Sequence, residues 1–154
     1  MPLTAEDHRL VLETLDAYAE RYDAKDVDGV SSLFVRDSEV VLFGTGADEV
    51  WVGYHQVREQ FARNFAEAEA VHFEWTWRRI SGTKGSAWAA TTANVHVTVD
   101  GVMHTISIRF SVVPGRRDGE WKWVHRHARL QPVGRAPASR IQSLTVTLAL
   151  QPDS

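Results

Sequence analysis

Apolar positions in the first third of the chain repeat with the period of a helix. Four such residues are spaced four, three and four positions apart, namely Val11, Leu15, Tyr18 and Tyr22. Charged residues occupy the positions between them, and a T-x-x-D pattern at Thr4 precedes them as a helix start. A second, shorter stripe follows Asp26, and a third follows Gly53. The pattern therefore predicts three N-terminal helices.

The remainder of the chain has the pattern of strands. Residues 71–80, 87–99, 102–113 and 121–130 are rich in aromatic and β-branched residues and are separated by glycine-containing turns. Asp100 and Gly101 join two of these runs, as in a two-residue type I′ hairpin turn. We expect an α+β domain with an antiparallel sheet. Beyond residues 132–137, alternating apolar positions predict one more strand, which would pair with the sheet edge or with a second subunit.

The hairpin turn sets a register if Val99 faces Val102. One face of the two strands then carries polar side chains, which are Asn94, His96, Ser107, Arg109 and Ser111. The other face carries apolar side chains such as Val95, Ile106 and Phe110. The pattern alone leaves two interpretations open. Either the apolar face is core and the polar face is solvated, or the polar face lines a pocket and the apolar face contacts another subunit.

Composition narrows the class of protein. The chain has 154 residues, no cysteine, a net charge of -3 and 44% hydrophobic residues. These values exclude a disulfide framework and give no global attraction to nucleic acid or to an anionic membrane. No apolar run is long enough to span a bilayer, and the first residues lack the features of a signal peptide, so we expect a cytoplasmic protein. Six tryptophans and seven histidines favour a small-molecule pocket.

Two segments carry a resemblance to a known superfamily. Residues 48–53 (DEVWVG) before a helix, and residues 118–127 (DGEWKWVHRH), resemble the SnoaL-like or nuclear transport factor 2-like proteins. The resemblance covers residues 4–131 and leaves 132–154 as a C-terminal extension. It implies that the helices pack in a curved sheet that forms a cone with an internal cavity. It also implies a homodimer through the outer sheet face, and it places the polar strand face in the cavity.

Within this superfamily, residues 19–26 resemble scytalone dehydratase-like lyases. The resemblance implies four catalytic residues: Tyr22, Asp23, His72 and His96. Asp23 would fix the tautomer of His72, which would remove a proton alpha to a carbonyl, and His96 or Tyr22 would protonate a leaving hydroxyl. A second tyrosine of that family falls on Leu42, so the tyrosine pair is incomplete. The implied reaction is a cofactor-free elimination or cyclisation of a polyketide-like or aromatic substrate.

Further residues are candidates for holding the substrate. They are Asn94, Ser107, Arg109, Ser111, His125, His127, Tyr18, Trp51, Phe61 and Phe65. The His-x-His pair could bind a metal, but a third ligand is not evident, and we expect no metal and no cofactor. On the 71–80 strand, His72 and the tryptophans cannot share one face without a β-bulge. The alternative hypothesis is a non-catalytic domain that binds an acidic small molecule or associates with other copies.

Overall fold

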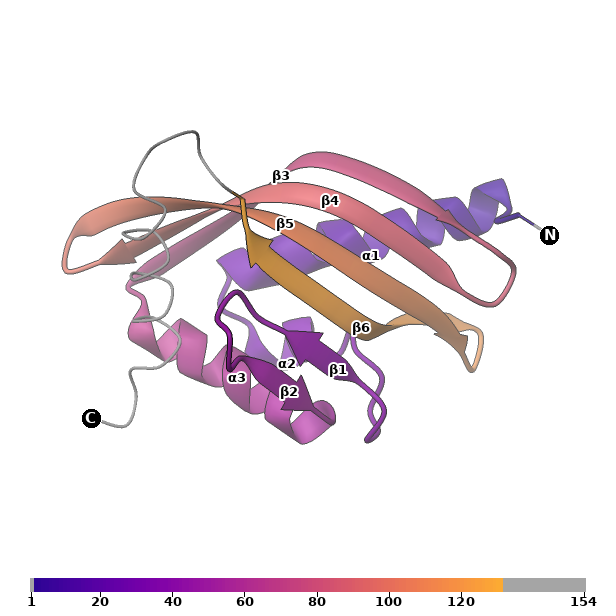
Figure 1. The fold of residues 1–154 in the computed structure, drawn as a ribbon, viewed down its shortest axis with the longest axis horizontal. Coiled ribbons are helices and arrows are strands. Elements are labelled where there is room, and N and C mark those ends of the chain that lie inside the picture. The colour runs from indigo at the N-terminus through magenta and orange to yellow at the C-terminus, as the bar shows by residue number, and fades with distance from the viewer. Residues whose placement is uncertain (1, 132–154) are drawn as a thin grey trace.

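The computed structural model describes residues 2–131 as a layer of helices against one sheet (Figure 1). The elements in chain order are α1 (Ala5–Asp23), α2 (Val27–Ser31), β1 (Val41–Phe43), β2 (Val50–Val52), α3 (Tyr54–Glu67), β3 (Ala70–Gly82), β4 (Ala87–Val99), β5 (Val102–Arg117) and β6 (Glu120–Leu130). The expected α+β class and the three N-terminal helices are confirmed. The predicted C-terminal strand lies outside the described residues.

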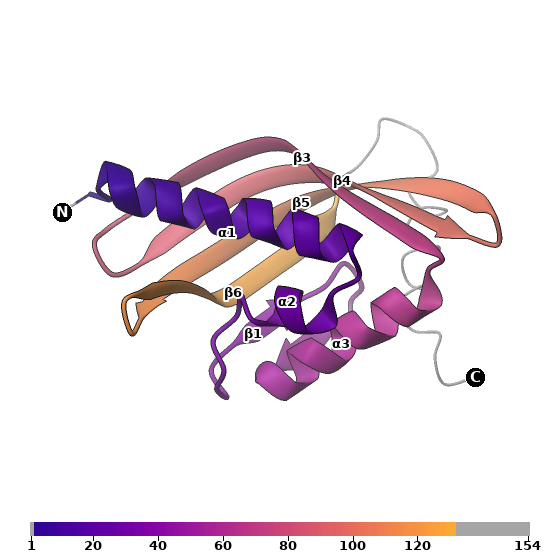
Figure 2. The same ribbon diagram turned by 180° about the vertical axis from the view of Figure 1, so that it is seen from behind.

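The six strands form one curved, open sheet in the order β2-β1-β6-β5-β4-β3. All neighbours are antiparallel except β1 and β6, which run parallel. Figure 2 shows helix α1 lying along the concave face of β3 to β6, with α2 and α3 on the same side, beside the lower edge of the sheet. Between the sheet and these helices lies the core.

Local sequence explains how α1 is placed. Thr4 caps the helix, because its hydroxyl oxygen accepts a hydrogen bond from the backbone N–H of Asp7 at 3.0 Å. The predicted stripe is buried, and Tyr18 is only 1% exposed. Its ring stacks on Trp123 of β6 at 5.0 Å and meets Phe73 of β3 edge-on at 5.2 Å. The aromatic cluster therefore holds α1 against two strands of the sheet, β3 and β6.

The predicted hairpin is confirmed residue by residue. Val99 pairs with Val102, and His96 pairs with Thr105 across β4 and β5. The register continues as expected through Asn94 and Ser107, whose side chains share a hydrogen bond of 2.8 Å. The residues that share each face of the hairpin were thus predicted correctly.

Two β-bulges interrupt the alternation of inward and outward side chains. On β3, Trp75 pairs with Ala93 but Trp77 pairs with Thr92, so Thr76 is an extra residue. Trp75 consequently packs against the core, whereas Trp77 is 52% exposed. The other bulge lies on β6, where Val124 is the extra residue between the pairs Val113–His125 and Pro114–Trp123.

Among the described residues, no helix is both long enough and apolar enough to cross a membrane.

The buried carboxylate of Asp7 joins α1 to β5 and β6. Arg116 donates a hydrogen bond to it at 2.7 Å and the Trp121 indole donates one at 3.2 Å. Burial raises the pKa of Asp7, but hydrogen bonds from Trp121 and Thr4 and the charge of Arg116 outweigh it and lower the pKa.

We expect Asp7→Asn to lower the melting temperature at neutral pH. Because folding lowers the pKa of Asp7, the wild-type carboxylate stabilises the fold above its ordinary pKa of 3.8, and this contribution is lost as the pH falls below that value. The difference in melting temperature between wild type and variant should therefore shrink at about pH 3. Thermal denaturation at both pH values checks this, and an equal difference at each would contradict it.

Candidate functional site

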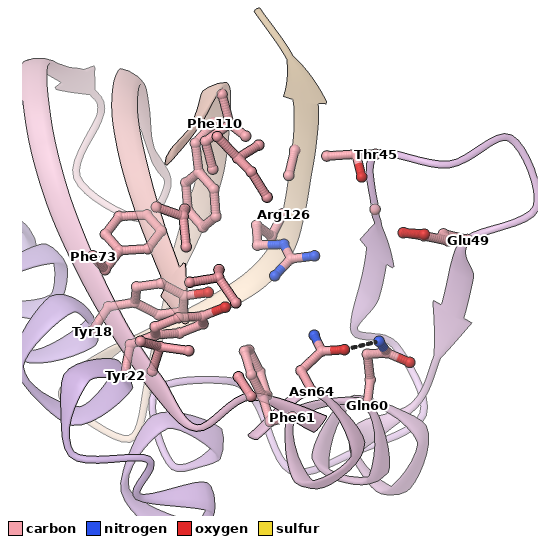
Figure 3. A pocket seen from close by; sticks show the side chains of 18 of the residues that line it. Tyr18, Tyr22, Thr45, Glu49, Gln60, Phe61, Asn64, Phe73, Phe110 and Arg126 are labelled. Atoms are coloured by element: carbon pink, nitrogen blue, oxygen red, sulfur yellow. Dashed lines mark hydrogen bonds between the residues drawn. The ribbon is translucent and has the colours of Figure 1, made fainter. Parts of the chain in front are cut away.

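A cavity of about 130 Å³ lies between the concave face of the sheet and the helices, open at one side (Figure 3). Helix α1 contributes Tyr18 and Tyr22, and α3 contributes Gln60, Phe61 and Asn64. The connection between β1 and β2 contributes Gly44, Thr45 and Glu49. The sheet contributes mainly apolar side chains, which are Val71, Phe73, Val95, Val97, Ile106, Ile108, Phe110 and Ala128. The lining is therefore an apolar wall with a smaller polar end.

The expectation that the polar strand face lines the cavity is wrong. Val95, Ile106, Ile108 and Phe110 line it, and in a strand their neighbours point to the opposite face. The outer face therefore carries the five polar candidates, Asn94, His96, Ser107, Arg109 and Ser111. The apolar face is needed inside because it packs against the aromatic residues of α1 and α3. The interpretation that made the apolar face core was the correct one.

Among the described residues that line the cavity, Arg126 is the one with a cationic side chain. It is 8% exposed and lies on β6 with its guanidinium directed toward α3 (Figure 3). The guanidinium lies over the ring of Phe110, 5.4 Å from its centroid, and a long hydrogen bond of 3.5 Å reaches the carbonyl of Phe43. No carboxylate of the described residues lies within 4 Å of it, and its Nε has no hydrogen-bond partner there. A buried cation of this kind favours an anion in the cavity.

The same end of the cavity holds other buried polar atoms without partners. Among the described residues, Thr45 Oγ1, Glu49 Oε1 and Gln60 Oε1 have no hydrogen-bond partner, like Arg126 Nε. Leaving one such atom unsatisfied costs about 1–3 kcal/mol. Gln60 donates one N–H of its amide to Asn64 at 2.8 Å, as the dashed line in Figure 3 shows, and its oxygen has no partner among the described residues. The cluster suggests a place for the polar groups of a ligand or for water.

Glu49 is the last residue of the connection between β1 and β2, and its side chain folds back against the glycines of that connection. Its carboxylate comes so close to Gly44 and Gly46 that a Cβ at either position would lie 2.2 and 2.8 Å from its oxygens. Burial raises the pKa of Glu49, while backbone N–H groups of Gly46 and Thr45 and the charge of Arg126 act in the opposite direction. A carboxyl group whose pKa is raised inside a cavity is a candidate for proton transfer to or from a ligand.

Tyr18 and Tyr22 of α1 line the apolar part of the cavity. Burial raises the pKa of Tyr18, and the charge and hydrogen bond of Arg126 oppose this change. Burial, followed by the neighbouring Tyr18, also raises the pKa of Tyr22. Both phenols are therefore neutral at physiological pH and can donate a hydrogen bond.

Asp23 and His72 do meet, as the resemblance to dehydratases implies. Asp23 Oδ2 lies 2.6 Å from His72 Nδ1, and Asp23 Oδ1 accepts the backbone N–H of Phe73 at 2.6 Å. The His72 ring stacks on that of His96 at 5.6 Å. However, the His72 side chain is 58% exposed, and neither histidine nor Asp23 lines the cavity. The structure thus brings the three residues together at the β3 edge of the sheet, outside the cavity lining.

The remaining candidates divide in the same way. Tyr18, Tyr22, Trp51 and Phe61 line the cavity, and Phe65 is buried with its ring against Tyr22 at 5.0 Å. His125 and His127 contact the exposed ring of Phe43, each at 5.5 Å, and do not line the cavity. Within the described residues, no group of three or more His, Asp or Glu side chains is arranged to hold a metal ion.

Sequence reasoning missed Arg126, Glu49, Gln60 and Thr45. Arg126 lies between the two histidines that were chosen, and the bulge at Val124 turns it inward in their place. Glu49 belongs to the quoted segment 48–53, where its charge before an apolar run was the available sign. Gln60 follows Val57 on the buried face of α3 and could have been found from that position.

The electrostatics of Glu49 give a direct prediction. Its pKa, followed by NMR titration of the carboxyl carbon, should lie above the ordinary value of 4.5, and Arg126→Met should raise it further. The second change follows because Arg126 favours the charged carboxylate. A Glu49 pKa that stays the same or falls in the variant would contradict this arrangement.

Comparisons with known proteins agree with this fold. A family model described as a SnoaL-like domain matches residues 11–130, whereas no curated protein sequence gives a significant match. A candidate dehydratase of the NTF2-like family from Streptomyces avermitilis has a TM-score of 0.76 and is 21% identical, covering 84% of this chain and 100% of its own.

Two other solved structures have similar scores. A candidate aromatic ring hydroxylase from Novosphingobium aromaticivorans has a TM-score of 0.76 at 22% identity, covering 86% of this chain and 94% of its own. A candidate calcium/calmodulin dependent protein kinase II association domain from Xanthomonas campestris has a TM-score of 0.71 at 20% identity, covering 80% and 87%. At these identities the likeness concerns the fold alone.

Proposed function

The chain belongs to the SnoaL-like domain family, and we propose that it binds a small, flat organic anion in the cavity beneath its sheet. The observation that carries this proposal is the buried Arg126, which has no carboxylate partner within 4 Å among the described residues. A guanidinium presents a planar fork that fits a carboxylate or an enolate. The anion would supply the close carboxylate partner that the described residues do not give Arg126.

The size and lining of the cavity support a ring-shaped ligand. An engineered apolar cavity of about 150 Å³ holds benzene, so the 130 Å³ found here suits one aromatic ring, with the open side left for substituents. Phe73, Phe110 and the two tyrosines present ring faces and edges to such a ligand. Aromatic acids are therefore favoured over multi-ring polyketides as the ligand class.

Benzoate is a suitable probe for the anion site. Arg126→Met should weaken its binding at least tenfold, since a hydrogen-bonded charged pair contributes about 1.5–3 kcal/mol. The matched control is Arg129→Met, which removes the same group from the exposed face of β6 three residues away and should leave the affinity unchanged. Isothermal titration calorimetry measures both. Equal losses in the two variants, or no loss in either, would contradict the proposal.

A second candidate function is cofactor-independent lyase or cyclase chemistry in the same cavity, favoured by the raised pKa of the Glu49 carboxyl group. In this proposal the Glu49 carboxylate removes a proton alpha to a carbonyl, and the C–H electron pair forms an enolate whose oxygen Arg126 stabilises. The enolate then expels a β-hydroxyl group, which takes the proton back from Glu49 and leaves as water. Glu49 takes the role that the dehydratase resemblance implied for His72, because His72 does not line the cavity.

We also propose that two copies associate through the outer face of the sheet. Trp77 of β3 and Trp88 of β4 are each 52% exposed on this face. Large exposed apolar side chains on neighbouring strands are consistent with an interaction surface. The similarity to an association domain is consistent with this assembly.

Replacing Trp77 and Trp88 together by lysine should convert a dimer into a monomer, because the proposed contact would lose two large aromatic side chains and gain two charges. Sedimentation analysis measures the mass. Val102→Lys serves as the control, since Val102 is 54% exposed but lies at the hairpin tip. A wild-type chain that sediments as a monomer would refute the proposed assembly.

A further inference from the structure

We infer that the ligand is a hydroxylated single-ring acid, which carries a hydrogen-bond donor as well as the anion that Arg126 holds. This inference deepens the proposed anion-binding function and rests on it. Three further polar residues line the same cavity, and each has a buried oxygen that finds no partner among residues 2–131: Thr45, Glu49 and Gln60. An anion alone would pair with Arg126 and could accept the O–H of Thr45, but it would satisfy neither the Gln60 oxygen nor an ionised Glu49 carboxylate.

The side-chain oxygen of Gln60 is the acceptor that most clearly requires a hydrogen-bond donor on the ligand. Its side chain is 4% exposed on α3, and its amide nitrogen already donates to Asn64 at 2.8 Å. The remaining atom, Oε1, can only accept a hydrogen bond. Neither a carboxylate nor an apolar ring can donate one, so a ligand that satisfies Gln60 presents an O–H or N–H group.

The other two oxygens surround the same end of the cavity from the turn between β1 and β2. An ionised Glu49 carboxylate accepts hydrogen bonds only, while the Thr45 hydroxyl accepts and donates. Glycines at 44 and 46 let this turn approach the Glu49 carboxylate, since a Cβ at either position would lie within 3 Å of it. Acceptors thus come from α3 and from the turn, while the cation comes from β6.

The volume of the cavity limits the distance on the ligand between its anionic group and its hydrogen-bond donor. A space of 130 Å³ accommodates one ring, with Phe73 and Phe110 on the apolar side. If the ring carries a hydroxyl group away from its carboxylate, the carboxylate can pair with Arg126 while the hydroxyl donates to one of the acceptor oxygens. The chemical class is therefore a hydroxybenzoate-like acid. An unhydroxylated acid of the same size would leave the acceptors unsatisfied, at a cost in affinity.

The test compares ligands that differ only in the donor. The 3- and 4-hydroxybenzoates are matched with 3- and 4-methylbenzoate, which have nearly the same shape but no O–H group, and affinities are measured by calorimetry. At least one hydroxybenzoate should bind wild type about threefold to tenfold more tightly than its methyl counterpart, as one neutral hydrogen bond predicts. Gln60→Leu and Thr45→Val should reduce this ratio, and at least one of them should bring it below about twofold.

Controls separate the possible failures. Thr98→Val on β4, which is not part of the cavity lining, should keep the wild-type ratio. If methylbenzoates bind as tightly as hydroxybenzoates in wild type while Arg126→Met still abolishes binding, the donor requirement is overturned and anion binding stands. If none of the acids binds in an Arg126-dependent manner, the anion-binding function itself fails. If Gln60→Leu does not fold, Thr45→Val and the wild-type ratio decide the outcome.

Discussion

The extra residue at Val124 determines which side chains of β6 face the cavity. Strand side chains alternate, so a regular strand from buried Trp123 would send His125 and His127 inward and Arg126 outward. The bulge reverses this order beyond Val124, and Arg126 becomes buried while His127 is exposed. Pro114, which lacks an N–H group, lies opposite the irregularity, where a regular ladder would lose a hydrogen bond. The chemistry of the cavity therefore depends on one inserted residue.

Placing Arg126 inside has an energetic consequence for the rest of the cavity. Within the part of the chain that the structure describes, this guanidinium has no carboxylate within 4 Å, which is unfavourable for folding, and the oxygens of Thr45, Glu49 and Gln60 that lack partners there add to the cost. Packing in the aromatic cluster around Tyr18 and Trp123 offsets this cost. Concentrating unsatisfied groups in one place, beside a well-packed core, is what distinguishes a binding site from a structural cavity.

Sequence patterns predicted the parts of the fold that depend on local periodicity. The stripe from Val11 to Tyr22 was enough to predict α1, and Asp100–Gly101 set the hairpin register through Val99 and Val102. The same register left the choice of face open, and the family resemblance resolved it wrongly. The buried face is the one that packs against α1 and α3. Alternation along a strand shows which residues share a face, but it does not show which face meets the helices.

The candidate site shows how choosing the wrong face of a strand changes a functional assignment. Asp23 and His72 contact each other as expected, yet β3 directs His72 outward while its neighbours Val71 and Phe73 line the cavity. Residue types therefore matched the dehydratase pattern while the strand face did not. Acid–base chemistry inside the cavity then depends on Glu49 and the two neutral tyrosines, because among the described residues they are the titratable groups that share the lining with Arg126.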